Sequence, residues 1–312
     1  MEKSAGKRKD KNKFNNKDEI IIDFENITKN YGKKRVINDF NLQVKKGEVL
    51  ALLGKNGAGK TTLFKILLNI VKADEGKIEI MGESNKKSKI RENISFLGED
   101  YRLYSYLNAE EIIELASKFY KKYDKEWALN KLEEFDIPLN KKIEKFSKGM
   151  KQTVRLIQAL ANKGEIIILD EPSAGLDVKM QNEIITLIQD INNKGKTVLF
   201  SSHNLLEVKK LAERVAFMKK GEIVAVKDKS FIAREENKII FVPQKKINEN
   251  ELVIDGITGI EKDGSKYIIY YEKNEKEIVK HLTQYPYFKL EYGESDLEEF
   301  FLKITGGDDN SN

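Results

Sequence analysis

Gly54-Lys55-Asn56-Gly57-Ala58-Gly59-Lys60-Thr61 is the stretch that decides the fold. It fits the pattern G-x-x-x-x-G-K-[S/T] and lies between an apolar run, EVLALL, and a helix-forming run that starts at Lys60. Glycines let such a loop curl so that backbone N–H groups converge on phosphate oxygens, and the positive end of the following helix faces them. Lys60 would contact the β- and γ-phosphates, and the Thr61 hydroxyl would bind Mg²⁺. The stretch therefore predicts a nucleoside-triphosphate site that extends to Thr62, against the alternative of a glycine-rich turn without a ligand.

A second motif, Ile166-Ile167-Ile168-Leu169-Asp170-Glu171, places two carboxylates after four apolar residues. Such a run is typical of a central parallel strand that is buried on both faces, and ligands bind at the carboxyl ends of such strands. We expect Asp170 to reach the Mg²⁺ shell and Glu171 to act on a water near the γ-phosphate, as a base or as an orienting group. Apolar strands that end in Asp-Glu are common, so this interpretation depends on the phosphate loop in the same chain.

Around these motifs, short apolar runs alternate with helical patterns, which predicts an α/β fold with a largely parallel sheet. Apolar residues at helical spacing over 108–135 predict a helical insertion of about residues 100–160 within an ATP-binding domain of residues 19–228. From 231 to 305 the pattern changes to short strands and two helices, 275–284 and 295–304, which predicts a small α+β C-terminal region. The expected strands of the ATP-binding domain are 19–27, 37–44, 48–54, 77–82, 93–99, 165–170, 196–200, 215–218 and 222–226.

Composition narrows the class of protein further. The 312 residues are 40% hydrophobic and 34% charged and include no cysteine, which excludes disulfides and thiolate metal sites. Residues 1–17 hold seven Lys/Arg and two acidic residues and so account for the net charge of +5. We expect residues 1–18 to be a disordered basic tail, either solvated or attracted to anionic lipid headgroups. The body of the chain is electrically balanced, which argues against a nucleic-acid partner.

A third motif, which indicates the protein family, lies upstream of the Asp170-Glu171 pair: Phe146-Ser147-Lys148-Gly149-Met150-Lys151-Gln152. This stretch resembles the signature L-S-G-G-Q of ABC (ATP-binding cassette) ATPases, and its form S-K-G-M-K-Q is similar to the variant in export-type cassettes that pair with separate permeases. Ser147 and Gly149 would offer a hydroxyl and an N–H to an anion at a helix start. In the family, this site closes on the γ-phosphate held by the other subunit. The alternative is a serine that caps an ordinary helix.

Other motifs follow in the order that the family implies. Asn30-Tyr31-Gly32 resembles the adenine-stacking loop, in which Tyr31 would offer its ring face to the base, unless it is a core tyrosine. Ser173-Ala174-Gly175-Leu176-Asp177 resembles the loop that joins the two subunits. Ser201-Ser202-His203 resembles the switch histidine that acts in catalysis, with a purely structural histidine as the alternative. His281 is incidental.

Three residues depart from the family pattern. Glu99 stands where the family usually carries a glutamine that reaches Mg²⁺ and senses the membrane partner. A carboxylate can still ligate Mg²⁺, but it adds negative charge beside the γ-phosphate. Lys148 replaces the first signature glycine, and Thr153 stands where an arginine is common. These departures concern the details of dimer closure.

The resemblance spans about residues 20–227 and implies a P-loop NTPase cassette that converts ATP and water to ADP and phosphate. It implies dimerisation, with a second copy of this chain as the simplest partner, beneath a separate transmembrane permease at the cytoplasmic face of the cell membrane. No window approaches the roughly 18 apolar residues that span a bilayer, so we expect membrane contact through that partner. The segment 296–306 resembles the chain end of drug and peptide exporter ATPases, which favours export.

Two other functions stay open. A soluble ABC ATPase that acts on ribosomes or DNA typically has two cassettes or a long coiled-coil insertion, whereas this sequence shows one phosphate loop. An import cassette usually has a longer, β-barrel-like C-terminal region. The residues expected at the site are Glu171 and His203 for catalysis, Thr61, Glu99 and Asp170 for the metal, and Tyr31, Gly54–Thr62, Ser147 and Gly149 for ATP.

Overall fold

The computed structural model describes residues 19–99, 102–232, 237–293, 297–298 and 300–302. The chain separates into two compact units. One comprises the chain up to Leu50 together with Thr61–Phe200, and the other comprises Ala51–Lys60 together with the chain from Ser201 onward. The expected basic tail and the C-terminal end lie outside the described residues. The expected domain boundary near residue 230 stays a prediction.

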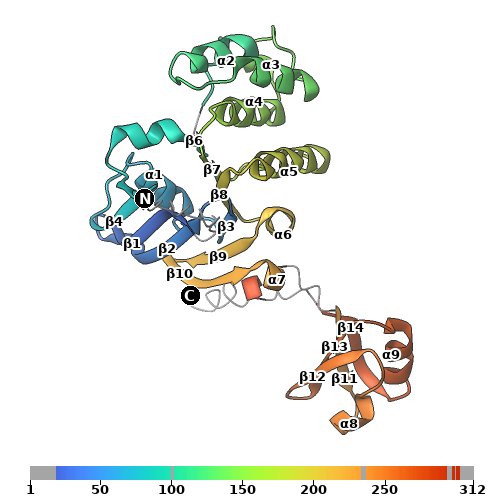
Figure 1. The fold of residues 1–312 in the computed structure, drawn as a ribbon. Helices are drawn as coiled ribbons and strands as arrows, with labels where there is room; N and C mark the ends of the chain where they lie inside the picture. Colours follow the sequence, from blue (N-terminus) through green and yellow to red (C-terminus); the bar gives the residue numbers. More distant parts are fainter. Residues whose placement is uncertain (1–18, 100–101, 233–236, 294–296, 299, 303–312) are drawn as a thin grey trace, which may run out of the picture. The chain divides into compact units, whose positions relative to one another are not determined.

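An antiparallel sheet with strand order β2-β1-β4-β5 lies in the first unit (Figure 1). In the second half of β2, the buried residues Phe40, Leu42 and Val44 alternate with exposed polar residues, so one face packs on the core and the other meets water. The strands are β1 (Ile20–Tyr31), β2 (Lys34–Lys45), β4 (Glu75–Ile80) and β5 (Glu83–Ser84).

A second, six-stranded sheet has the strand order β10-β9-β3-β8-β7-β6. Every residue of β3, β7 and β8 is buried, as expected for central strands covered on both faces. Strands β6 and β7 pair in parallel, whereas β9 and β10 form an antiparallel pair. The strands are β3 (Val49–Leu53), β6 (Ile94–Leu97), β7 (Ile166–Asp170), β8 (Thr197–Ser202), β9 (Arg214–Lys219) and β10 (Glu222–Asp228).

The expected helical insertion is present as α2 (Ala109–Ser117), α3 (Lys125–Glu134) and α4 (Lys148–Leu160), which lie together in Figure 1. Asn108 starts α2 with a capping box to Glu111, and Asp124 caps α3. The three helices share a core of buried apolar residues that includes Ile113, Leu132 and Ile157. Further helices are α1 (Lys60–Leu67), α5 (Val178–Asn193), α6 (Leu205–Leu211) and α7 (Lys229–Ile232), and short 3₁₀ turns lie at Ser88–Asn93 and Ile143–Lys145.

The C-terminal region contains an antiparallel sheet with strand order β12-β13-β11-β14. The helix expected at 275–284 is present as α9 (Glu275–Leu282), which buries Ile278 and Leu282 in the same core as Phe241 and Ile269 of the sheet. Much of the helix expected at 295–304 lies outside the described residues. The other elements are β11 (Asn237–Pro243), α8 (Glu249–Leu252), β12 (Ile257–Asp263), β13 (Lys266–Tyr271) and β14 (Tyr287–Tyr292). Among the described residues of the whole chain, no helix is long and apolar enough to cross a membrane.

Candidate nucleotide site

The phosphate loop runs from the end of β3 to the start of α1. Gly57 and Gly59 have φ angles of +82° and +110°, a region that side-chain-bearing residues rarely adopt. A Cβ atom on Gly54 would lie 2.5 Å from the carbonyl oxygen of Met218, so this position admits no side chain without a backbone shift. The local sequence therefore needs glycines for two different reasons, conformation and close approach.

The Lys60 ammonium is folded into this loop. It donates to the carbonyl oxygens of Gly54 at 2.6 Å and Lys55 at 3.4 Å, and the residue is only 6% exposed. The charge is thus held at the first turn of α1, next to the loop whose N–H groups would bind phosphates. The role of Lys60 at the phosphates stays a prediction.

Tyr31 ends β1 and is 50% exposed, which fits a ring that stacks on a base rather than a core tyrosine. Its segment is anchored by Asp74. One carboxylate oxygen of Asp74 accepts from the Lys29 ammonium at 2.7 Å, and the other accepts from the Asn30 backbone N–H at 2.7 Å. The Lys29 contact, and then the Asn30 N–H, lower the pKa of Asp74. The Lys29 ammonium in turn lies 5.6 Å from the centre of the Tyr31 ring.

Two of the three expected metal ligands meet directly. The Thr61 hydroxyl, in the first turn of α1, donates to Oε2 of Glu99 at 3.2 Å. Glu99 follows β6 and is exposed, so its carboxylate stands at the surface beside the phosphate loop helix. The two residues come from segments 38 positions apart.

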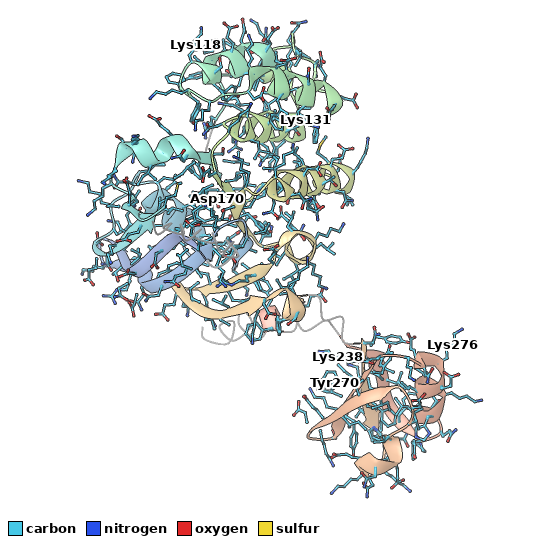
Figure 2. All side chains as sticks on the ribbon, in the orientation of Figure 1. Lys118, Lys131, Asp170, Lys238, Tyr270 and Lys276 are labelled. Carbon is cyan, nitrogen blue, oxygen red and sulfur yellow. The ribbon has the colours of Figure 1, made fainter. Side chains whose placement is uncertain are left out.

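Asp170 and Glu171 stand at the carboxyl end of β7. Asp170 is the last residue of this strand and is 1% exposed, and Figure 2 places it in the interior of its unit. Glu171 is 9% exposed and has a φ angle of +52°, unfavourable for a residue with a side chain. Pro172 follows it and restricts the backbone of Glu171 further. Strain of this kind, worth about 1–3 kcal/mol, persists where surrounding contacts hold it.

The signature serine is the N-cap of α4. The Ser147 side chain accepts from the Met150 N–H at 3.1 Å, so the capping interpretation holds within the single chain. Ser147 is also exposed, and it therefore remains accessible to an anion from outside. The side chain of Lys148, which replaces the signature glycine, lies beside Gly175: a Cβ atom added to Gly175 would be 2.7 Å from Cε of Lys148. The signature and the Ser173–Asp177 loop are thus in contact.

His203 follows β8 and is exposed. The residue before it is fixed locally: the Ser202 hydroxyl donates to Glu207 at 2.6 Å and accepts from the Asn204 N–H at 2.9 Å. His281, for which no role was expected, donates from Nε2 to the Glu251 carbonyl oxygen at 2.8 Å in the C-terminal region.

Three residues that hold the site were not among the expected site residues, although Gln152 is the last residue of the signature stretch. These are Asp74, which anchors the segment of Tyr31, and Gln152 and Arg155, which contact the backbone beside Glu171 and Glu99. Gln152 donates to the Pro172 carbonyl at 3.0 Å, and Arg155 donates to the Glu99 carbonyl at 2.8 Å. A polar face on an amphipathic helix was the available signal, but it does not tell which backbone such residues contact.

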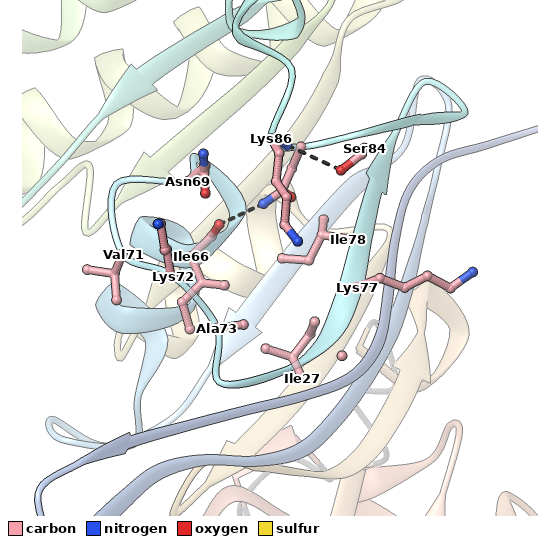
Figure 3. A pocket seen from close by; sticks show the side chains of 12 residues that line it. Ile27, Ile66, Asn69, Val71, Lys72, Ala73, Lys77, Ile78, Ser84 and Lys86 are labelled. Carbon is pink, nitrogen blue, oxygen red and sulfur yellow. Dashed lines mark hydrogen bonds between the residues drawn. The ribbon is translucent and has the colours of Figure 1, made fainter.

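Among the cavities lined by described residues, two in the first unit differ in their relation to the site. One, of about 410 Å³, has an apolar part formed by Ile27, Ile66 and Ile78 and contains none of the expected site residues (Figure 3). The other, of about 720 Å³, is lined by Glu99, Gln152 and Arg155 and by further residues of the insertion. The second cavity therefore adjoins the candidate site.

The residue types present fit Mg²⁺. Mg²⁺ is usually held by one or two carboxylates together with phosphate oxygens and water, rather than by a cage of protein ligands. Thr61, Glu99 and Asp170 supply oxygen donors of this kind. Within the described ranges, no group of three or more His, Asp or Glu side chains could hold a metal by itself.

Comparisons with known proteins decide the family. The family model described as ABC transporter matches residues 37–174. The chain is 31% identical to the linearmycin resistance ATP-binding protein LnrL of Bacillus subtilis (strain 168), over 92% of this chain and 98% of that protein. The chain belongs to the ABC transporter ATP-binding proteins.

Other relatives of this ABC protein agree. It is 30% identical to the bacitracin transport ATP-binding protein BcrA of Bacillus licheniformis, over 92% of this chain and 98% of the relative. The dimeric ATP-binding cassette MJ0796 in a post-hydrolysis state with ADP and Pi matches with a TM-score of 0.62 at 28% identity, over 67% of this chain and 99% of that chain. The α/β cassette fold expected from the sequence is thereby confirmed, and the chain carries an ABC ATPase domain.

Proposed function

We propose that this chain is the ATP-hydrolysing subunit of an ABC exporter, paired with a second cassette and coupled to a separate permease. The observation that carries the proposal is the contact between the Thr61 hydroxyl and the Glu99 carboxylate at 3.2 Å. It brings the phosphate-loop helix and the loop after β6 together, and these are the two segments that would share the γ-phosphate and its metal.

ATP binding is assigned to the phosphate loop and to Tyr31. Backbone N–H groups of Gly54–Gly59 would hold the phosphates, and the Lys60 ammonium would exchange its contacts with loop carbonyls for the β- and γ-phosphates. The Tyr31 ring would stack on adenine, a contact worth about 1–3 kcal/mol for bases on aromatic side chains. Thr62, next to Thr61, belongs to the same first turn of α1.

Hydrolysis is assigned to Glu171, with His203 at the γ-phosphate. The Glu171 carboxylate would accept a proton from the attacking water or orient that water. Thr61, Glu99 and Asp170 would hold Mg²⁺, which when bound neutralises charge on the phosphate oxygens. His203, exposed after β8, would donate to the transferred phosphoryl group.

The signature is assigned to the nucleotide of the opposite subunit. Ser147 and the first turn of α4 offer an exposed helix start, which favours an anion. Two identical chains related by a twofold axis would each contribute a phosphate loop and a signature to two equivalent sites. The dimeric cassette MJ0796 supports this arrangement.

The permease is expected at the 720 Å³ cavity next to Glu99. The charged residues that line this cavity are mostly basic, and Leu103 and Ile143 add apolar surface to it. This composition suits a membrane-protein segment with acidic and apolar side chains. Such docking would place the chain at the cytoplasmic face of the membrane.

Export is favoured over the alternatives by the relatives. Their names include linearmycin resistance and bacitracin transport, which supports removal of a drug or peptide. A soluble cassette on ribosomes or DNA, or an import cassette, is the second candidate, but no feature of the site favours either.

The test is purification of the tagged full-length chain from membranes, followed by identification of the bound protein and an ATPase assay. A polytopic membrane protein in stoichiometric amount, with ATPase activity in the complex, is the expected result. Recovery with ribosomal proteins, or an inactive chain, would contradict the proposal.

A further inference from the structure

A line of hydrogen bonds connects the loop after β6 to the loop after β7. The Arg155 guanidinium donates from Nη2 to the carbonyl oxygen of Glu99 at 2.8 Å and also to that of Gly98. Its other arm, Nη1, donates to Oε1 of Gln152 at 2.9 Å. Both side chains stand on α4, one turn apart, and therefore share a helix face.

Gln152 continues this line of hydrogen bonds to the loop after β7. Its Nε2 donates to the carbonyl oxygen of Pro172 at 3.0 Å and to that of Glu171 at 3.4 Å. The side chain is buried at 6% exposure. A glutamine can accept from a guanidinium and donate to carbonyls at once, and only one orientation of its amide does both.

The hydrogen bonds from Gln152 reach a strained segment of the backbone at Glu171. Glu171 has φ of +52° and precedes a proline, two features that disfavour its conformation. The carbonyl oxygens on both sides of the Glu171–Pro172 junction are the ones that Gln152 contacts. Loss of the contact would free the backbone that aims the Glu171 carboxylate.

At its other end, the line fixes Glu99. The Glu99 carboxylate accepts from Thr61, while its carbonyl is held by Arg155, so the residue is tied at both its side chain and its backbone. Arg155 is partly buried, and it uses a planar fork of donors that a lysine lacks. The Arg155 side chain thus contacts the backbone of Glu99, an expected metal ligand. Through Gln152 it is also connected to the backbone of Glu171, the residue expected to act on the attacking water.

We propose that Arg155 is a positioning residue for ATP hydrolysis: braced by Gln152, it sets the backbone of Glu99 relative to that of Glu171. This inference rests on the proposed roles of Glu99 and Glu171. Because Arg155 also lines the cavity beside Glu99, the brace lies where a docked partner would reach it.

The first test is Arg155→Met in the purified full-length chain, measured by ATP titration and steady-state hydrolysis. The phosphate loop is untouched, so the Kd for ATP stays within about twofold while kcat falls by about 10- to 100-fold, as small misplacements of reacting groups do. The matched control is Lys131→Met on α3, which removes a cation from the insertion at a side chain 27% exposed. The control keeps kcat. A normal kcat in Arg155→Met would overturn the proposal.

The second test separates a brace from general stabilisation. Gln152→Glu keeps size and the bond from Arg155 but places an oxygen against the Glu171 and Pro172 carbonyls, so kcat falls by more than the accompanying decrease in melting temperature explains. Combining Gln152→Glu with Arg155→Met should lower kcat no further than the more severe single variant. Additive losses, or a kcat that merely follows the melting temperature, would refute a shared brace. If Arg155→Met does not fold, Arg155→Lys replaces it, with the same expected loss.

Glu171→Gln is the reference for the underlying assignment. If this variant is inactive while Arg155→Met hydrolyses ATP normally, the brace is wrong and the site stands. If Glu171→Gln hydrolyses ATP normally, the proposed function of the site fails instead.

Discussion

The ammonium of Lys60 lies 2.6 Å from the carbonyl oxygen of Gly54, at the opposite end of the phosphate loop. Without nucleotide, the Lys60 ammonium thus contacts the backbone of its own loop. When ATP binds, the ammonium would contact the phosphates instead. Replacement of Lys60 by Ala removes both the loop contact and the charge on the transferring phosphoryl group. We expect hydrolysis to be largely lost, whereas Tyr31→Ala mainly weakens ATP binding, by about 1–3 kcal/mol. Nucleotide titration and hydrolysis assays on both variants check this; unchanged turnover in Lys60→Ala would refute the site.

Gly54→Ala should damage the loop through a backbone clash. The new Cβ would lie 2.5 Å from the Met218 carbonyl oxygen and 3.1 Å from Cβ of Ala58, so the loop or β9 must move. Overpacking of this kind costs about 1–3 kcal/mol of unfolding free energy, and ATP binding should fall with it. Gly264→Ala is the control: it has φ of +64° but open space around it, so about 1 kcal/mol of strain is expected with normal ATP binding. Equal ATP affinity in the two variants would contradict the clash.

Asp74 should titrate at unusually low pH. The Lys29 ammonium and the Asn30 N–H lower its pKa below 3.8, so its contribution to stability is present above that pH and is lost as the pH falls through the lower folded-state pKa. Carboxyl chemical shifts measured against pH give this value directly. At neutral pH, Asp74→Asn should weaken ATP binding by loosening the segment of Tyr31. An Asp74 pKa at or above 3.8 would show that these contacts do not persist in solution.

Glu99→Gln tests the departure from the family pattern at the metal side. The amide keeps an oxygen but removes a negative charge beside the γ-phosphate, so ATP should bind more tightly in EDTA and the Mg²⁺ concentration for half-maximal hydrolysis should rise several-fold. An ATP titration in EDTA measures the first effect, and a Mg²⁺ titration of hydrolysis measures the second. Glu114→Gln, on α2, serves as the control. An unchanged Mg²⁺ dependence would remove Glu99 from the metal site.

The sequence predicts the parts of this molecule that depend on local rules. Gly57 and Gly59 reveal the phosphate loop because positive φ angles need glycine, and the unbroken apolar run of β7 reveals a buried strand that delivers Asp170. Ser147 is recognisable as a helix cap because a serine side chain before a helix accepts from an unpaired N–H of the first turn.

Contacts that depend on tertiary structure were not predictable in this way. Arg155 looks like part of the polar face of an amphipathic helix, and Gln152 like the end of the signature stretch, until the loops beside Glu99 and Glu171 are placed against them. Asp74 belongs to a turn between α1 and β4, and nothing in that turn indicates a partner at Lys29. Pairing across distant segments is set by packing, which periodicity does not encode.

The central claim is that Glu171 hydrolyses ATP at a site closed by the signature of a second subunit. The most direct test is to measure the oligomeric state of Glu171→Gln with ATP and Mg²⁺ by light scattering. The amide keeps the size of the side chain but cannot activate water, so hydrolysis should fall by roughly 10²- to 10⁴-fold. ATP binding through Lys60 and Thr61 is retained, and we predict an ATP-dependent dimer that Ser147→Arg in the same chain abolishes. Normal hydrolysis by Glu171→Gln, or a dimer that survives Ser147→Arg, would contradict the claim.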